Sequence, residues 1–276
     1  MHFSYLLIGG DARQQHLLNL LISAGKTAEG IFIKTEQNEE EALKKIENAD
    51  VVVLPIPSST DGKFLFAPNC ENKILLTSIT ERIKEKTLLF TGGENPAFTA
   101  SKAKIKVNLL ENEEMTLKNA MATAEAALAI LIENTDKTVF GSNILIIGYG
   151  RIAKIMAEYL KALKANVTVC ARKETAKTKA YIAGHRAIGF DRLIDSLKTF
   201  NVIINTAPAP VLMENELKQI SKDAIILDLA SKPGGTDFIK AKELGIKAIH
   251  ALSLPGKYSS KSAAEYIEDV IYNTII

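Results

Sequence analysis

Short apolar runs bounded by turn residues alternate with longer segments of helical period along the whole chain. This alternation is typical of a parallel sheet covered by helices, so it predicts an α/β fold. In the first half, the predicted strands are residues 5–8, 30–33, 51–54, 74–77 and 88–90, with helical spacing at 15–23 and 39–47. In the second half, they are residues 143–147, 167–170, 202–205, 225–229 and 248–250, with 187–189 as a weaker member.

A segment without Gly or Pro, residues 113–134, separates the two strand series and predicts a helix of about twenty residues. We therefore predict two doubly wound parallel-sheet domains. The first, residues 1–118, would carry substrate and catalytic groups, and a connecting helix at 119–140 would lead to the second, residues 141–259. Residues 260–276 have one apolar helical face, which either caps the second domain or packs back on the first.

Composition narrows the class of protein. Apolar residues make up 47% of the chain, and 34 basic residues nearly cancel 32 acidic ones. No net field is available to hold a polyanion or an acidic membrane, so we expect no nucleic acid and no membrane partner. A signal-peptide pattern is lacking, and no apolar run approaches about 18 residues. Cys70 and Cys170 show neither pairing nor metal-ligand spacing. We expect a cytoplasmic protein without a metal.

The strongest local signal follows the strand predicted at 143–147. Gly148-Tyr149-Gly150-Arg151-Ile152-Ala153 is a G-x-G-x-x-A motif, with a predicted helix and a second strand after it. The first glycine permits a tight turn, the second lets the backbone approach a pyrophosphate, and the alanine keeps the helix close to the strand. The helix dipole then favours the phosphates. The motif predicts a Rossmann dinucleotide-binding domain, against the alternative of an ordinary tight turn.

The end of the second strand of this domain indicates which nicotinamide cofactor binds. Arg172 and Lys173 stand where an acidic side chain would accept from a ribose 2′-hydroxyl. A guanidinium suits a 2′-phosphate, so we predict NADP, with NAD possible. The alternative is a solvated strand end. Two loops at later strand ends are expected to line the cofactor, through Thr206, Ala207, Pro208, Ala230 and Ser231.

Four further segments are not explained by packing. They are residues 9–14, 119–125, 228–235 and 254–257. Together with the Gly148 motif, and in this order, they resemble the A subunit of dipicolinate synthase of spore-forming bacteria. The wider resemblance is to two-domain dehydrogenases of the 2-hydroxyacid and alanine dehydrogenase type, although no Arg, Glu and His set is placed as in the 2-hydroxyacid enzymes.

The resemblance implies oxidation of a dihydrodipicolinate-type ring, from a branch of the lysine pathway, to pyridine-2,6-dicarboxylate during sporulation. It also implies a heteromeric complex whose other member is a flavoprotein-like B subunit. Two rival functions are a shikimate- or methylenetetrahydrofolate-type NADP dehydrogenase and a non-catalytic NADP(H)-binding subunit. We also expect a homo-oligomer.

A small dicarboxylate needs cationic or N–H-rich clamps. Arg13 suits one, because its planar fork matches a carboxylate, and Lys257 is the candidate for the other. We expect Lys257 on a loop of the second domain, so that the two clamps face one another across a cleft. Further donors after the strands of the first half are Ser58, Ser59, Thr60, Gly92 and Gly93.

The proton acceptor has four candidates: Asp11, Glu125, His250 and Lys257. His250 is the best placed histidine, because it ends a predicted strand, whereas His185 is expected in a surface turn. Each has a structural alternative. His250 would be packed, Asp11 would cap the following helix, and Glu125 and Lys257 would be solvated. For Arg13, the alternative to a clamp is an ion pair with an acidic neighbour.

Overall fold

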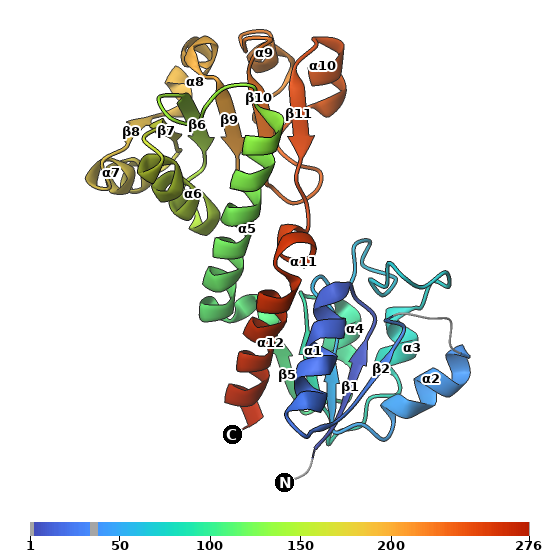
Figure 1. The fold of residues 1–276 in the computed structure, drawn as a ribbon. Coiled ribbons are helices and arrows are strands. Elements are labelled where there is room, and N and C mark those ends of the chain that lie inside the picture. The colour runs from blue at the N-terminus through green and yellow to red at the C-terminus, as the bar shows by residue number, and fades with distance from the viewer. Residues whose placement is uncertain (1–2, 34–37, 276) are drawn as a thin grey trace. The chain divides into compact units, whose positions relative to one another are not determined.

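The computed structural model describes residues 3–33 and 38–275, and it divides into two compact units. The first unit is Met1–Asn119 with Pro255–Ile276, and the second is Ala120–Leu254. Each unit contains one parallel sheet with helices on both faces, which confirms the α/β fold (Figure 1). The second unit is therefore inserted into the first.

The first unit has a five-stranded sheet of order β2-β1-β3-β4-β5. Its central strands are buried on both faces, as expected for a parallel sheet. In chain order its elements are β1 (Ser4–Ile8), α1 (Ala12–Ser23), β2 (Thr27–Ile31), α2 (Glu39–Ile46), β3 (Val51–Val53), α3 (Leu76–Thr80), β4 (Leu88–Thr91), α4 (Pro96–Ala100), β5 (Ile105–Asn108), the short 3-10 helix η1 (Leu109–Glu111) and the start of α5 (Glu113–Asn134).

The second unit has a six-stranded sheet of order β11-β10-β9-β6-β7-β8, in which β6 and β9 are central. The strand order reverses beside β6, so its carboxyl end lies at a topological switch point. The elements are β6 (Asn143–Ile147), α6 (Arg151–Ala162), β7 (Asn166–Cys170), α7 (Glu174–Ile182), β8 (Arg186–Ile188), η2 (Phe190–Arg192), α8 (Leu193–Ser196), η3 (Leu197–Thr199), β9 (Val202–Asn205), α9 (Glu214–Leu217), β10 (Ile225–Asp228), α10 (Phe238–Glu243), β11 (Lys247–His250) and α11 (Leu254–Tyr258), which leads back to the first unit.

In the first half, one predicted strand was wrong and one strand was missed. Residues 74–77 are not a strand: Leu75 forms a single antiparallel bridge with Phe64, and α3 begins at the next residue. Leu76, Ile79 and Ile83 follow one another at helical spacing and are buried in the core of the first unit. The sequence analysis also missed β5, a short edge strand in which Ile105 and Lys106 are exposed.

The C-terminal helix α12 (Ser260–Ile275) packs against α1 of the first unit (Figure 1). Its apolar face, with Ala264, Ile267 and Ile271, joins Leu17 and Leu21 in one core. The sequence left this packing open. The chain re-enters the first unit at Pro255, before the boundary predicted after residue 259.

Among the described residues, one helix, α5, is long and apolar enough to cross a membrane by length and composition alone. Within the second unit its small and apolar residues, including Ala124, Ala127 and Leu131, are buried against the sheet. Packing therefore accounts for this composition.

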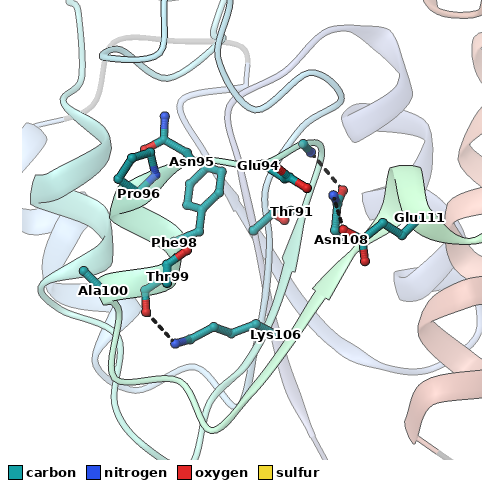
Figure 2. Close-up of a pocket in the computed structure, with 11 residues that line it drawn as sticks. Thr91, Glu94, Asn95, Pro96, Phe98, Thr99, Ala100, Lys106, Asn108 and Glu111 are labelled. Carbon is teal, nitrogen blue, oxygen red and sulfur yellow. Dashed lines mark hydrogen bonds between the residues drawn. The ribbon is translucent and has the colours of Figure 1, made fainter.

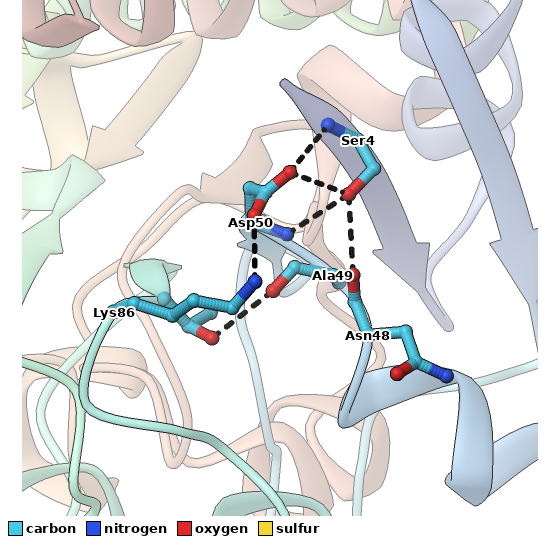
Figure 3. Close-up of polar contacts among 6 residues, drawn as sticks. Ser4, Asn48, Ala49, Asp50 and Lys86 are labelled. Atoms are coloured by element: carbon cyan, nitrogen blue, oxygen red, sulfur yellow. Dashed lines mark hydrogen bonds and ion pairs between the residues drawn. The ribbon is translucent and has the colours of Figure 1, made fainter. Parts of the chain in front are cut away.

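A polar cluster fixes the amino ends of β1 and β3 (Figure 3). The carboxylate of Asp50 accepts from the backbone N–H of Ser4 at 3.0 Å, from its hydroxyl at 2.8 Å and from Lys86 at 3.2 Å. These bonds, the Ser4 N–H first, lower the pKa of Asp50. The cluster lies at the end of the sheet opposite to the loops in which ligands of α/β sheets bind, so its role is structural.

Candidate active site

The turn from β6 into α6 has the backbone that the sequence predicts for a phosphate loop. Gly148 has φ +97°, and a side chain there would also collide with the Thr206 hydroxyl. That hydroxyl donates to the carbonyl of Ile147 at 2.9 Å, which fastens the loop after β9 to the end of β6. Glycine is therefore required at this position by both conformation and space.

Gly150 is the N-cap of α6, and no side chain caps this helix end. A Cβ built on Gly150 would meet no atom of the described chain within 4 Å, its sequence neighbours aside. Ala153 is fully buried and holds the helix on the sheet. An open space in front of a helix amino end, where amide groups and the helix dipole favour anions, fits the pyrophosphate of a dinucleotide.

At the end of β7, Arg172 and Lys173 are exposed, and neither forms an ion pair within the described chain. The first acidic side chain after them, Glu174, pairs with Lys177 at 2.5 Å. The carboxyl end of β7 therefore presents two cationic side chains to solvent. Cys170, the last residue of β7, is inert, because burial raises the pKa of its thiol to about 12.

A buried network, which no local sequence pattern reveals, shapes the loops after β9 and β10. Asp228 is fully buried, and its carboxylate accepts four hydrogen bonds from three segments. The donors are the Asn205 amide at 3.0 Å, the Ala230 N–H at 3.0 Å, the Gly235 N–H at 2.9 Å and the Thr236 hydroxyl at 2.7 Å. Asn205 also bonds both backbone groups of Ala207. These two residues hold the predicted cofactor-lining residues Thr206 to Pro208 and Ala230 to Ser231 in place.

His250 lies at the same carboxyl edge, at the end of β11. Its Nε2 is 2.9 Å from the carbonyl of Ala230, and its ring stacks on Phe238. A carbonyl only accepts, so Nε2 carries the proton. In the neutral ring Nδ1 is then the basic nitrogen, and it has no hydrogen-bond partner in the described chain.

The structure corrects the clamp arrangement around Arg13. Arg13 and Lys257 both belong to the first unit, because the chain re-enters it at Pro255. The Arg13 fork is engaged by Asp11, through Nε at 2.9 Å and Nη2 at 2.8 Å, and Nη2 also donates to the Ile56 carbonyl. Gly256 packs directly on this pair, and a side chain there would collide with Asp11. The Arg13 edge predicted to bind a carboxylate is thus occupied by Asp11.

Asp11 also caps α1 by accepting from the Arg13 N–H at 3.1 Å. Burial by itself raises the pKa of Asp11, but the hydrogen bonds and charge of Arg13 outweigh this effect, so the pKa lies below its ordinary value. Asp11 is therefore a weak proton acceptor. Lys257 is exposed on α11, and Glu125 is exposed on α5.

The predicted donors after β3 and β4 have structural partners. Ser58 is buried; its hydroxyl donates to Pro55 and accepts from the Gly92 N–H at 2.8 Å. The Ser59 hydroxyl donates to the Phe64 carbonyl. Thr60 is exposed, and the Gly93 N–H donates to Asn108 at 3.1 Å.

Gly93 and Asn108 nevertheless border an open groove of about 940 Å³ between α4 and β5. Figure 2 shows Phe98 and Thr99 of α4 on one side and Lys106 of β5 facing them. The Lys106 ammonium donates to the Thr99 carbonyl at 2.9 Å and so ties the two walls together.

His185 is not a surface residue, in contrast to the prediction. It is buried, and its Nε2 lies 3.0 Å from the Glu158 carboxylate on α6. The His185 N–H donates to the carbonyl of Ala180 in α7, and this bond holds the turn after α7 against that helix.

The glycine turn, the helix end without a side-chain cap and the switch point of the parallel sheet are the features of a Rossmann-type dinucleotide-binding unit. A family model described as the N-terminal domain of the A subunit of dipicolinate synthase matches residues 4–112. The NAD-binding domain of D-isomer specific 2-hydroxyacid dehydrogenases matches residues 118–232. This chain belongs to the family of dipicolinate synthase A subunits.

Relatives over nearly the full length support this assignment. The chain is 30% identical over 278 residues to the A subunit of dipicolinate synthase of Bacillus subtilis strain 168, with 96% of this chain and 93% of that protein covered. The crystal structure of the corresponding protein from Bacillus halodurans aligns with a TM-score of 0.86 at 27% identity, covering 99% of this chain and 98% of the other. The crystal structure of the Bacillus subtilis protein aligns with 0.83 at 26%, covering 100% and 96%. The cofactor domain identifies the chain as an oxidoreductase that uses a nicotinamide cofactor.

Proposed function

We propose that this chain is the dehydrogenase subunit of a dipicolinate synthase, which oxidises a dihydrodipicolinate-type ring to pyridine-2,6-dicarboxylate with NADP. The observation that supports this most is the open space at Gly150, in front of an uncapped helix, in a chain related over its length to the A subunit of dipicolinate synthase.

The cofactor would be held along the carboxyl edge of the second sheet. Its pyrophosphate would meet the backbone of residues 148–152, and its 2′-phosphate would meet Arg172 and Lys173. The loops fastened by Asn205 and Asp228 would line the nicotinamide half. The bound cofactor supplies the hydride acceptor.

Aromatisation of the dihydro ring removes a hydride and a proton, so the chain must supply a proton acceptor. We assign this role to His250, whose Nε2 is held by Ala230 and whose Nδ1 carries the free lone pair. The stacked Phe238 fixes the ring orientation. Asp11 is the weaker candidate because Arg13 stabilises its carboxylate form. Glu125 and Lys257 remain candidates on exposed positions.

The substrate is proposed to be a small dicarboxylate. Lys257 forms no ion pair within the described residues, so its charge is available to a carboxylate, whereas the Arg13 fork is shared with Asp11. Ser58, Thr60 and Gly93 stay candidates for weaker contacts at the strand ends of the first unit.

We further propose that the chain works in the cytoplasm, as a homo-oligomer and together with a flavoprotein-like B subunit. Its relative in Bacillus subtilis is named as one of the subunits of a synthase, which supports the existence of a partner.

The test is turnover of freshly generated dihydrodipicolinate with NADP, first by this chain alone and then in the presence of the B subunit. We expect reduced cofactor and pyridine-2,6-dicarboxylate to form in equal amounts. His250→Gln should abolish most turnover and keep NADP affinity, whereas His16→Gln should change neither. Cofactor binding without turnover in both preparations would instead identify a non-catalytic role. Turnover of shikimate or methylenetetrahydrofolate would replace the proposed substrate.

A further inference from the structure

The loop that follows β8 lies directly beside the end of β7. Cys170 pairs with Ile188 in the sheet, and the Ala171 N–H donates to the Ile188 carbonyl at 3.1 Å. The chain then turns at Gly189, whose carbonyl accepts from the Arg192 N–H at 3.2 Å. In a Rossmann unit the adenosine ribose rests on the end of the second strand, which is β7 in this chain. The β8 loop is therefore the neighbour of the ribose on the outer side of the sheet.

Two side chains of opposite charge lie close to Gly189 of this loop. A Cβ on Gly189 would collide with the Asp191 carboxylate, and it would lie 3.5 Å from the Lys177 ammonium. Glycine at 189 thus leaves the space in which both charged groups sit. Lys177 reaches this place from α7, with its side chain 24% exposed and oriented by Glu174.

The charges of both groups act on the end of β7. Burial raises the pKa of the Cys170 thiol most, the charge of Asp191 raises it further, and the charge of Lys177 lowers it. Asp191 forms no ion pair within the described part of the chain, so its carboxylate keeps its full acceptor capacity.

We propose that Lys177 and Asp191 read the 2′ position of the adenosine ribose together with Arg172. Lys177 and Arg172 bind the 2′-phosphate of NADP, whereas Asp191 accepts from the 2′-hydroxyl of NAD. The inference rests on the proposed function in one respect, namely that the second unit binds a nicotinamide dinucleotide. It adds that the preference for NADP over NAD depends on both Lys177 of α7 and Asp191 of the β8 loop, and not on Arg172 alone.

Loss of the Lys177 charge and loss of the Asp191 charge should change the affinity for NADP in opposite directions. A 2′-phosphate is attracted by the cations and repelled by the carboxylate, whereas a hydroxyl gains a charge-assisted bond only from the carboxylate. Lys177→Gln should weaken NADP binding roughly tenfold and leave NAD unchanged, in line with one charged hydrogen bond. Asp191→Asn should tighten NADP binding by a factor of a few and weaken NAD binding.

Isothermal titration of the full chain with NADP and NAD tests this, with 2′,5′-ADP and 5′-AMP as probes of the adenosine half. Lys179→Gln on the same helix and Asp195→Asn, both at exposed positions, are the matched controls and should change neither affinity. Lys177→Arg should restore the NADP preference. Circular dichroism melting verifies that each variant is folded.

The outcomes separate the two proposals. If the variants change the affinities for both cofactors by the same factor, or change neither affinity, the proposed recognition by Lys177 and Asp191 is overturned. The dehydrogenase proposal is then left intact. A native chain that binds neither dinucleotide nor fragment overturns both.

Discussion

Replacement of Asp228 by asparagine should destabilise the second unit and weaken cofactor binding together. One carboxylate oxygen accepts from Asn205 and Ala230, and the other accepts from Gly235 and Thr236. An amide nitrogen at the first oxygen's position would face two donors. At the second, the Thr236 hydroxyl can turn to accept, so only the Gly235 N–H loses its partner.

The orientation that places the amide nitrogen at the second oxygen's position gives the smallest loss of unfolding free energy. One buried N–H without an acceptor costs about 1–3 kcal/mol, and the remaining bonds lose the strength that the ionised acceptor gave them. We expect the variant to lose ~2–4 kcal/mol of unfolding free energy. Cofactor affinity should fall about tenfold, since the loops after β9 and β10 lose their anchor.

Urea denaturation followed by circular dichroism measures the loss, and hydrogen exchange at residues 225–236 assigns it to the second unit, because a chain of two units need not unfold in one step. Asp223→Asn, an exposed carboxylate on the turn before the same strand, is the control and should stay within ~0.5 kcal/mol. An Asp228→Asn chain with native stability and native NADP affinity would refute the anchoring role.

Three further changes test the site and the fold. Gly148→Ala should cost ~1–3 kcal/mol in thermal or urea unfolding, because φ +97° and the Thr206 hydroxyl both oppose a side chain. Gly150→Val should leave a folded chain, because its Cβ meets only open space, and should abolish dinucleotide binding by titration; retained micromolar binding would contradict the phosphate site. Asp50 has a lowered pKa, so its stabilisation is complete above the ordinary value of about 3.9 and is lost as pH falls through the lowered one. Asp50→Asn should thus reduce the acid-side loss of stability measured from neutral pH to pH 3, and an unchanged profile would argue against this account.

Much of the second unit could be predicted from the sequence because its signals are local. Each of its main features can be recognised from a few consecutive residues. These features are the strand Asn143–Ile147, the glycines at 148 and 150, and the strand ends at Asn205 and His250. The helix Glu113–Asn134 could also be predicted, because it contains no glycine or proline.

What could not be predicted depends on partners distant in sequence. From the sequence, Asp228 is recognised only as a residue at the end of a strand. The fold brings Asn205 and Thr236 to its carboxylate. For Arg13, the pairing with an acidic neighbour could be foreseen as the alternative to a clamp, whereas its bond to the Ile56 carbonyl follows from the packing of β3 beside β1. His185 follows a glycine, which signals a turn but says nothing about burial against Glu158. The β5 edge strand lacks the continuous apolar run that marks β3 and β4, and it was missed because its residues are exposed or only partly buried.

The packing of α12 on α1 has a consequence for the order in which the protein can form. During synthesis, Ala120–Leu254 is made between the two parts of the first unit, so the earlier half of the chain lacks part of its core until Ser260–Ile275 has been made. Until α12 arrives, Leu17 and Leu21 on α1 present an apolar surface to solvent. The first unit therefore cannot complete its core from Met1–Asn119 alone, even though most of its residues are made before those of the second unit.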